Sequence, residues 1–253
     1  MDLGQTGLVA ACGLVVSIFS VSVGGTALVM VPLLIFLGLD PRTAVASNRF
    51  AILFLSASGA VTFMRSVRLP QPGAIAAHIL PVAAGAFLGA TLVMITAQGT
   101  IKVVVAVATI AVALLLLLKR DIGLESRAEP AGRGRLLLSL ALVFPLSVYG
   151  GYFGGGYAAL LTYLLVLVLG LTFLEAVAAT RMLSVPMAAT ASILLGVRGA
   201  IDFGVAIPLA AGYLIGGRIG ARIAVRKGNR WVKTLFVLAA IAMSLRLLVT
   251  TLI

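Results

Sequence analysis

Long apolar runs are the feature of this sequence that most restricts its fold. Segments of about 20 apolar residues recur along most of the chain, and a helix of that length crosses the hydrocarbon core of a bilayer. Of the 253 residues, 62% are hydrophobic and only 10% are charged, whereas a soluble domain carries about 25% charged residues. The chain cannot cover itself with a polar surface, so we expect an all-α, polytopic membrane protein embedded in a lipid bilayer.

The charged and metal-binding residue types argue against several classes of function. The net charge of +12 comes from lysines and arginines in short loops beside apolar segments, a pattern that marks membrane topology rather than nucleic-acid binding. A single cysteine, Cys12, and a single histidine, His78, exclude an internal disulfide and argue against a metal site. The apolar segments also lack the paired acids, histidines or nucleophiles that an enzyme needs. We expect no enzymatic activity, no cofactor, no metal and no nucleic-acid partner.

The chain contains an internal duplication. A shift of 132 positions places Gly24 on Gly156, the LGL of 37–39 on that of 169–171, the AVA of 44–46 on that of 176–178, and Arg49 on Arg181. The only long polar segment separates the two copies. The sequence therefore predicts a first transmembrane repeat at 1–118, a basic cytoplasmic linker at 119–135 and a second transmembrane repeat at 136–253.

Glycines interrupt the apolar sequence early in each repeat. Gly24-Gly25 divides the first, and five glycines within seven residues, from Gly150 to Gly156, divide the second. Each glycine inside a helix costs roughly 1 kcal/mol relative to alanine. The next helix begins at Asp40-Pro41, an N-cap followed by proline, and at the capping box Thr172-x-x-Glu175. The expected apolar segments are 5–23, 26–37, 41–64, 73–97 and 101–118, then 136–149, 157–169, 173–195, 203–222 and 232–252. Each repeat thus contains a glycine-broken or re-entrant helix pair and three spanning helices.

Glycines four residues apart predict close helix packing. The set Pro81, Gly85 and Gly89 recurs in the second repeat as Pro208, Gly212 and Gly216. Small residues at this spacing line one helix face and allow a neighbouring helix to approach.

The distribution of basic residues predicts the topology. The loops at 65–68, 119–135 and 218–233 carry two, five and six basic residues, so the positive-inside rule places all three in the cytoplasm. With all three loops in the cytoplasm, each half of the chain must cross or enter the membrane an odd number of times. The two halves then have opposite orientations and are inverted repeats. If each glycine-broken segment were a single span, the halves would instead be parallel; we favour the inverted arrangement.

Inverted repeats with interrupted helices are typical of transporters that bind their substrate near the bilayer midplane. The interruptions free helix N-termini, whose partial positive charge suits anions. Arg49 and Arg181 each lie nine residues after the start of a helix, which is about 13.5 Å along its axis and close to half of a hydrocarbon core about 30 Å thick. Unpaired guanidinium groups there would suit sulfite, sulfonate or carboxylate oxygens. The alternative is that backbone carbonyls satisfy the arginines or that they extend to the surface.

The candidate substrate-binding residues combine the arginines, their polar neighbours and the glycine breaks. They are Arg49, Arg181, Asn48, Thr180, Ser47, Gly24, Gly25, Gly154, Gly155 and Gly156. The polar neighbours could equally bond their own helix backbone, and the glycines could serve only for packing. We interpret the tyrosines at 149, 152 and 157 as packing or interface residues, and His78 as lacking the acidic partner of a proton relay.

At these residues the sequence resembles the sulfite exporter TauE/SafE family of membrane permeases. The matching stretches are VGGTALVMVPLLIFLGLDPRTAVASNRFAILFLSASGAV from position 23, YGGYFGGGYAALLTYLLVLVLGLTFLEAVAATRMLS from position 149, and GGRIGARIAVRKG from position 216. The resemblance implies a carrier of the bacterial inner membrane for sulfite, sulfonates and related organic anions, driven by an ion gradient. Gly24-Gly25 stands where many members have a longer glycine run.

These observations predict a secondary transporter that moves a small organic or inorganic anion by alternating access, with a proton or sodium ion as coupling ion. An anion channel would share the glycine breaks and the arginines. A membrane scaffold would not need arginines repeated at equal depth, and it is the least favoured alternative.

Overall fold

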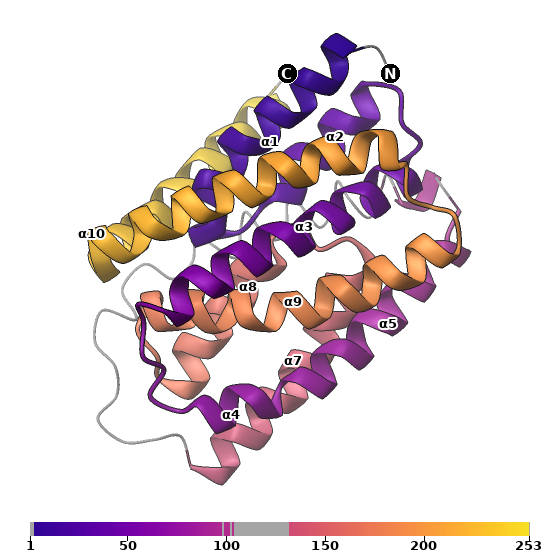
Figure 1. The fold of residues 1–253 in the computed structure, drawn as a ribbon. Coiled ribbons are helices and arrows are strands. Elements are labelled where there is room, and N and C mark those ends of the chain that lie inside the picture. Colours follow the sequence, from indigo (N-terminus) through magenta and orange to yellow (C-terminus); the bar gives the residue numbers. More distant parts are fainter. Residues whose placement is uncertain (1–2, 98, 102, 104–131, 253) are drawn as a thin grey trace.

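The structure is a computed structural model that describes residues 3–97, 99–101, 103 and 132–252, and within these ranges the chain forms helices and no strands (Figure 1). The helices are α1 (Leu3–Val23), α2 (Thr26–Phe36), α3 (Pro41–Met64), α4 (Pro72–Ala77), α5 (Ile79–Ile95), α7 (Arg133–Tyr152), α8 (Tyr157–Leu164), the π-helix η1 (Leu165–Leu169), α9 (Phe173–Val197) and α10 (Phe203–Leu252). Gly228, with φ of 78°, interrupts the helical conformation inside α10.

Six segments are long and apolar enough to cross a membrane. They are Gln5–Val23, Pro41–Met64, Pro72–Ile95, Arg133–Tyr152, Phe173–Val197 and Phe203–Val232. Thr26–Phe36 and Tyr157–Leu169 are shorter apolar helices. The prediction of an all-α, polytopic membrane protein is confirmed. The predicted segment 101–118, beyond its first residues, and most of the linker 119–135 lie outside the described residues.

The predicted helix starts at Asp40 and Thr172 are confirmed. The Asp40 carboxylate accepts hydrogen bonds from the backbone N–H groups of Arg42 and Thr43, each at 3.1 Å, and Pro41 occupies the first helical position. Thr172 and Glu175 form both hydrogen bonds of a capping box. These local signals set where the helices that carry the two arginines begin.

Two helix boundaries differ from the prediction. Helix α7 does not end before the glycine cluster but continues through Gly150 and Gly151 to Tyr152. The reason is close packing, since a Cβ atom at Gly151 would overlap the backbone of Ala86. Helix α7 also begins at Arg133, so the last basic residues assigned to the linker lie in its first turn.

The predicted segment 73–97 is divided at His78 into α4 and α5. The ring Nδ1 of His78 donates to the carbonyl of Ala74 at 2.6 Å, and its backbone N–H bonds Ile75 instead. Pro81, lacking an N–H, removes a further helical hydrogen bond at the same place. The break therefore follows from side-chain competition and a proline.

The later helix of each repeat packs against the other repeat. Helix α5 packs against α7, and α10 packs against both α1 and α3, whereas α3 and α9 meet at the centre of the molecule (Figure 1). The close approaches occur at the predicted glycines: Gly85 and Gly89 lie on the α7 backbone, and Gly212 and Gly216 lie on the α1 backbone. Close packing by small residues is confirmed, and each partner helix belongs to the other repeat.

Helices α3 and α9 run antiparallel. Arg49, in the first half of α3, contacts Met187, whereas Gly59, later in α3, lies beside the side chain of Arg181, earlier in α9. Equivalent helices of the two copies therefore run in opposite directions. This is the arrangement that inverted repeats require; their orientation across a bilayer stays a prediction.

Contacts between loops show which helix ends share a side of the molecule. Arg65 after α3 and Arg218 of α10 line one groove, and the Leu174 N–H at the start of α9 donates to Asn229 at 3.1 Å. At the opposite end, Ser47 near the start of α3 bonds Asp202, which follows α9. Residues 65–68 and 218–233, both predicted to be cytoplasmic loops, thus lie on the same side. The prediction of a loop at 218–233 was wrong, since these residues continue helix α10 through a kink at Gly228.

Candidate functional site

The two glycine breaks meet between α3 and α9. Helices α1 and α2 are separated by Gly24 and Gly25, with φ of 82° and 89°, and the break between α7 and α8 contains Gly154 and Gly156, with φ of 72° and 77°. These left-handed conformations disfavour residues with a Cβ atom. Gly24 lies on the start of α8, where a Cβ atom would be 2.8 Å from the backbone nitrogen of Ala159. The breaks are therefore in direct contact.

Each break ends in a helix N-terminus without a capping side chain. The N-caps of α2 and α8 are Gly25 and Gly156, and neither helix has a side-chain cap hydrogen bond. The first N–H groups of a helix have no intrahelical partner and carry partial positive charge. Two short helices thus present N–H donors at the same place.

Arg49 is buried without adequate hydrogen-bond partners. Its side chain is 1% exposed. Among the described residues, its Nε and Nη2 atoms have no hydrogen-bond partner, and Nη1 reaches only the thioether sulfur of Met187 at 3.6 Å. Sulfur is a weak acceptor. The guanidinium group lies on Gly154, where a Cβ atom would overlap it.

Arg181 is equally buried but well bonded. Its side chain is 3% exposed, its Nε donates to the carbonyl of Val21 at 2.8 Å, and its Nη2 donates to that of Ser20 at 2.9 Å. These carbonyls belong to the last turn of α1, the end of a helix that carries partial negative charge, and that of Ser20 also accepts from the Gly24 N–H at 2.7 Å. The alternative interpretation of the arginines, satisfaction by backbone carbonyls, describes Arg181.

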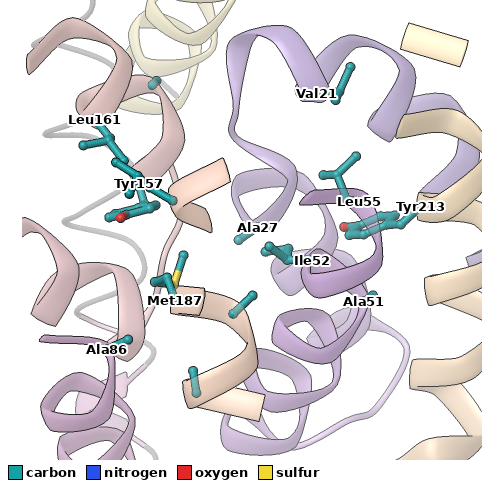
Figure 2. Close-up of a cluster of buried hydrophobic side chains, with 14 of the residues drawn as sticks. Val21, Ala27, Ala51, Ile52, Leu55, Ala86, Tyr157, Leu161, Met187 and Tyr213 are labelled. Atoms are coloured by element: carbon teal, nitrogen blue, oxygen red, sulfur yellow. The ribbon is translucent and has the colours of Figure 1, made fainter. Parts of the chain in front are cut away.

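A small cavity lies between the breaks and the arginines. Its volume is about 20 Å³, room for about one water molecule. It is lined by Gly24, Gly25, Thr26, Arg49, Ile52, Gly154, Tyr157, Ala158, Arg181, Ser184 and Met187. Figure 2 labels three apolar residues of this wall, Met187 of α9 and Tyr157 of α8, which lie near each other, and Ile52 of α3. None of the lining residues is acidic.

Five of the ten predicted site residues line this cavity: Gly24, Gly25, Arg49, Gly154 and Arg181. The structure places the other five elsewhere. Ser47 bonds the backbone of Asp202, with its oxygen accepting from the N–H at 3.0 Å. Asn48 accepts a hydrogen bond from the Tyr213 hydroxyl at 2.7 Å, and its Nδ2 atom has no partner in the described chain.

The remaining three predicted residues stabilise the second break. Thr180 pairs with Thr162 at 3.0 Å and joins α9 to α8. The carbonyl of Gly155 accepts a hydrogen bond from the Tyr149 hydroxyl. Gly156 is the N-cap of α8.

Sequence reasoning missed six lining residues: Thr26, Ile52, Tyr157, Ala158, Ser184 and Met187. Several carried a signal. Ile52 and Ser184 each follow an arginine by three positions and so share its helix face. Thr26 and Tyr157 directly follow the last glycine of a break. The position of Met187 depends on the packing of α9 against α3, which the sequence does not show.

Two glycine-broken helix pairs meet beside the buried arginines of the antiparallel helices α3 and α9, within a bundle of candidate spans. This arrangement defines a polytopic membrane protein of the transporter class. The comparisons with known proteins then specify the family. The sequence model of the family described as sulfite exporter TauE/SafE matches residues 9–247, and the chain belongs to this family.

Relatives with transporter names cover nearly the whole chain. The probable membrane transporter protein ORF9 of Sinorhizobium sp is 30% identical over 230 residues, which is 89% of this chain and 85% of the relative. A probable membrane transporter protein of Haemophilus influenzae is 26% identical over 98% of this chain and 96% of its own length. The probable membrane transporter protein YfcA of Escherichia coli K12 is 24% identical over 89% of this chain and 82% of its own length. No significant match to a solved structure was found. The chain is a multi-pass membrane transporter of the bacterial inner-membrane type.

Proposed function

We propose that this chain is a secondary transporter for a small sulfur-containing or carboxylated anion, which binds Arg49 between the two glycine breaks. The observation that carries the proposal is the unpaired guanidinium group of Arg49, 1% exposed with Nε and Nη2 unbonded in the described chain. A buried charge without partners costs several kcal/mol. An anion whose oxygens accept from these atoms would remove that cost.

The surroundings of Arg49 suit an anion with several oxygens. The N-termini of α2 and α8 add partial positive charge, and the cavity between them has no acidic lining residue. A planar guanidinium group matches pairs of oxygens on sulfite, sulfonate or carboxylate. The family name points to sulfite within this class. Arg181, held by α1 carbonyls, would position the first break and contribute charge at longer range.

Burial of the site favours a carrier over a channel. A conducting channel needs a continuous wet path past its charged groups, whereas Arg49 is enclosed by side chains in a cavity of about 20 Å³. Alternating access would open this cavity to one side at a time. The antiparallel α3 and α9 are the helices whose relative movement would do so, with a proton or a sodium ion as the coupling ion.

Inverted topology is part of this proposal. The halves 1–118 and 136–253 would have opposite orientations, joined by a cytoplasmic linker at 119–135. In a Cys12→Ser background, single cysteines at positions 126 and 200 should react with an impermeant reagent from opposite sides of the membrane. Labelling of both from one side would contradict the inverted repeat.

Flux into proteoliposomes tests the transport function. With labelled sulfite, a small sulfonate and a small carboxylate, we expect saturable uptake of at least one anion that responds to an imposed proton or sodium gradient. Unlabelled anion on the opposite side should accelerate exchange, which a carrier performs and a pore does not. Flux that rises linearly with concentration would identify a channel, and absence of flux for all three classes would contradict the proposed substrates.

A further inference from the structure

A second basic site lies at the membrane surface, apart from the central cavity. A groove of about 490 Å³ runs between α3 and α10 and is lined by Ala57, Ser58, Val61, Thr62, Arg65, Ser66, Leu214, Arg218 and Arg222. None of these residues lines the central cavity. Arg65, Arg218 and Arg222 are all exposed, and none of their side chains has a hydrogen bond or ion pair within the described chain. Three guanidinium groups without a counter-charge among the described residues make this groove a candidate anion site.

The groove changes from apolar to basic along both helices. Val61, 51% exposed, lies one helical turn before Arg65, and Leu214, 45% exposed, lies one turn before Arg218. Helices α3 and α10 run in the same direction here, and Gly217 packs on Leu55 and Ser58 of α3. Leu214 and Arg218 therefore lie nearer the middle of α3 than Val61 and Arg65 do. Arg65 directly follows the candidate span Pro41–Met64, whereas Arg218 and Arg222 lie within the span Phe203–Val232. On each helix the order from the apolar residue to the arginine is that of a bilayer, from hydrocarbon to headgroups.

Acidic residues of the described chain are not available to these arginines. Asp40 and Asp202 lie at the opposite end of α3 and α10, and Glu175 is engaged in the capping box of α9. Arg218 and Arg222 are also four residues apart on one helix, a spacing at which like charges repel. The hydroxyls of Ser58 and Thr62 donate to backbone carbonyls at 3.0 and 2.8 Å. The arginines are therefore the groups of the groove that remain available to an anion.

We propose that this groove binds an anionic phospholipid, with the phosphate on Arg65, Arg218 and Arg222 and an acyl chain along Val61 and Leu214. A free anion would satisfy the arginines but leave the apolar half of the groove uncovered, whereas a phospholipid fits both halves. The predicted topology assigns the lipid to the cytoplasmic leaflet, and such basic pockets between helices are a recurrent form of lipid headgroup recognition. Bound there, the lipid would join α3 to α10 and thus link the two repeats.

The test measures thermal stability of the purified full-length protein during titration with short-chain phosphatidylglycerol. Short-chain phosphatidylcholine supplies the acyl chains without net charge, and glycerol phosphate supplies the headgroup without acyl chains. We expect only phosphatidylglycerol to raise the melting temperature in a saturable way. Equal stabilisation by glycerol phosphate would assign the groove to a free anion and overturn the lipid proposal, as would equal stabilisation by phosphatidylcholine.

Substitutions locate the effect. The variant with Arg65→Gln, Arg218→Gln and Arg222→Gln should bind phosphatidylglycerol about a hundredfold more weakly, since each basic residue near an anionic membrane surface contributes about fivefold. The matched control carries Arg226→Gln, Lys227→Gln and Arg230→Gln, which remove the same charge from the same end of α10 outside the groove, and it should bind as the unmodified protein does. If the triple variant does not fold, Arg222→Gln alone should weaken binding about fivefold. Equal losses in the groove and control variants would reduce the effect to general surface charge and overturn the site.

Discussion

Arg49 and Arg181 occupy equivalent positions in the two repeats and are buried to the same degree, yet their hydrogen bonding is opposite. Arg181 places Nε and Nη2 on two carbonyls at the end of α1. The same two atoms of Arg49 have no partner in the described chain. Duplication has kept the residue but not its interactions. One copy therefore supports the fold, and the other has the unpaired guanidinium group that the proposed anion site requires.

The two breaks also differ in length. In the first repeat two residues separate α1 from α2, and Arg181 reaches the carbonyls of Val21 and Ser20 although the Ser20 carbonyl also accepts from the Gly24 N–H at 2.7 Å. In the second, four residues separate α7 from α8, and this longer turn bonds itself. The N–H groups of Phe153 and Gly154 both donate to the Tyr149 carbonyl, at 3.0 and 3.2 Å. Arg49 consequently meets Gly154 rather than an open carbonyl.

The helix after the break begins one residue earlier in the second repeat. The N-cap of α2, Gly25, lies 13 positions before Gly38, whereas the N-cap of α8, Gly156, aligns with Gly24 and lies 14 positions before Gly170. The π-helix η1, at Leu165–Leu169, lies within this longer helical segment, and a π-helical turn accommodates a single extra residue. Gly38 and Gly170 both have positive φ, at 98° and 73°. The extra helical residue thus leaves the start of α9 unchanged.

The largest expected effect comes from filling the space that Gly154 leaves beside Arg49. Gly154→Ala would place a methyl group on the guanidinium, and we expect no measurable anion binding by purified protein. Gly38→Ala is the matched control, because Gly38 has φ of 98° with nothing within 4 Å of an added Cβ. It introduces the same backbone strain of about 1–2 kcal/mol without the overlap and should retain binding. Normal affinity in Gly154→Ala would contradict the Arg49 site.

Removing the free guanidinium group should weaken binding while sparing the fold. Arg49→Gln should lower anion affinity roughly ten- to a hundredfold, because a hydrogen bond to a charged group contributes about 1.5–3 kcal/mol. Its melting temperature should stay the same or rise, since an unpaired buried charge is removed. Isothermal titration and thermal unfolding on one preparation measure both quantities. A loss of stability with intact affinity would show that Arg49 is structural.

Arg181→Gln should give the converse result. It removes two hydrogen bonds to α1 carbonyls, so unfolding should become easier by about 3 kcal/mol, while the protein that stays folded should bind the anion within about threefold of the unmodified protein. Lysine at this position should restore only part of the stability, because it cannot reach both carbonyls with one planar group. A hundredfold loss of affinity at unchanged stability would instead assign Arg181 to direct binding.

Much of the architecture could be predicted from local signals. The lengths of the apolar segments identified a polytopic membrane protein. Asp40 and Thr172 marked two helix starts, and Gly85 and Gly89 marked a close helix contact. Each of these effects acts within a few turns of one helix. The predicted end of α7 was wrong because Gly151 serves close packing against α5 and Gly150 makes room for the ring of Tyr157, rather than forming a break.

The site could be predicted only in part, because its chemistry depends on contacts between distant segments. The hydrogen bonding of the two arginines depends on which carbonyl groups lie within reach once the glycine breaks have folded. Likewise, Ser47 reaches Asp202 and Asn48 reaches Tyr213, partners more than 150 positions away. The exchange of α5 and α10 between the repeats is another such contact. Repeat symmetry suggested equal roles for the arginines, and the structure gives them unequal surroundings.

The smallest expected effect concerns Met187, the one described partner of Arg49. Its sulfur accepts from Nη1 at 3.6 Å, a weak interaction that an incoming anion would replace. Met187→Leu conserves volume and should change stability by less than about 1.5 kcal/mol. Because Arg49 then has no competing acceptor, affinity should stay equal or rise by up to about fivefold, since a weak hydrogen bond contributes at most about 0.5–1 kcal/mol.

Met182→Leu is the matched control for that substitution, since Met182 lies on α9 but faces a separate apolar cavity between α3, α4 and α5. It should leave affinity unchanged. A rise confined to Met187→Leu would show that the sulfur competes with the anion for one guanidinium group and would sharpen the contrast with Arg181, whose acceptors are fixed in the backbone. A tenfold fall in affinity would mean that Met187 orients Arg49 for binding. Arg49 would then be held in place by a protein group, as Arg181 is.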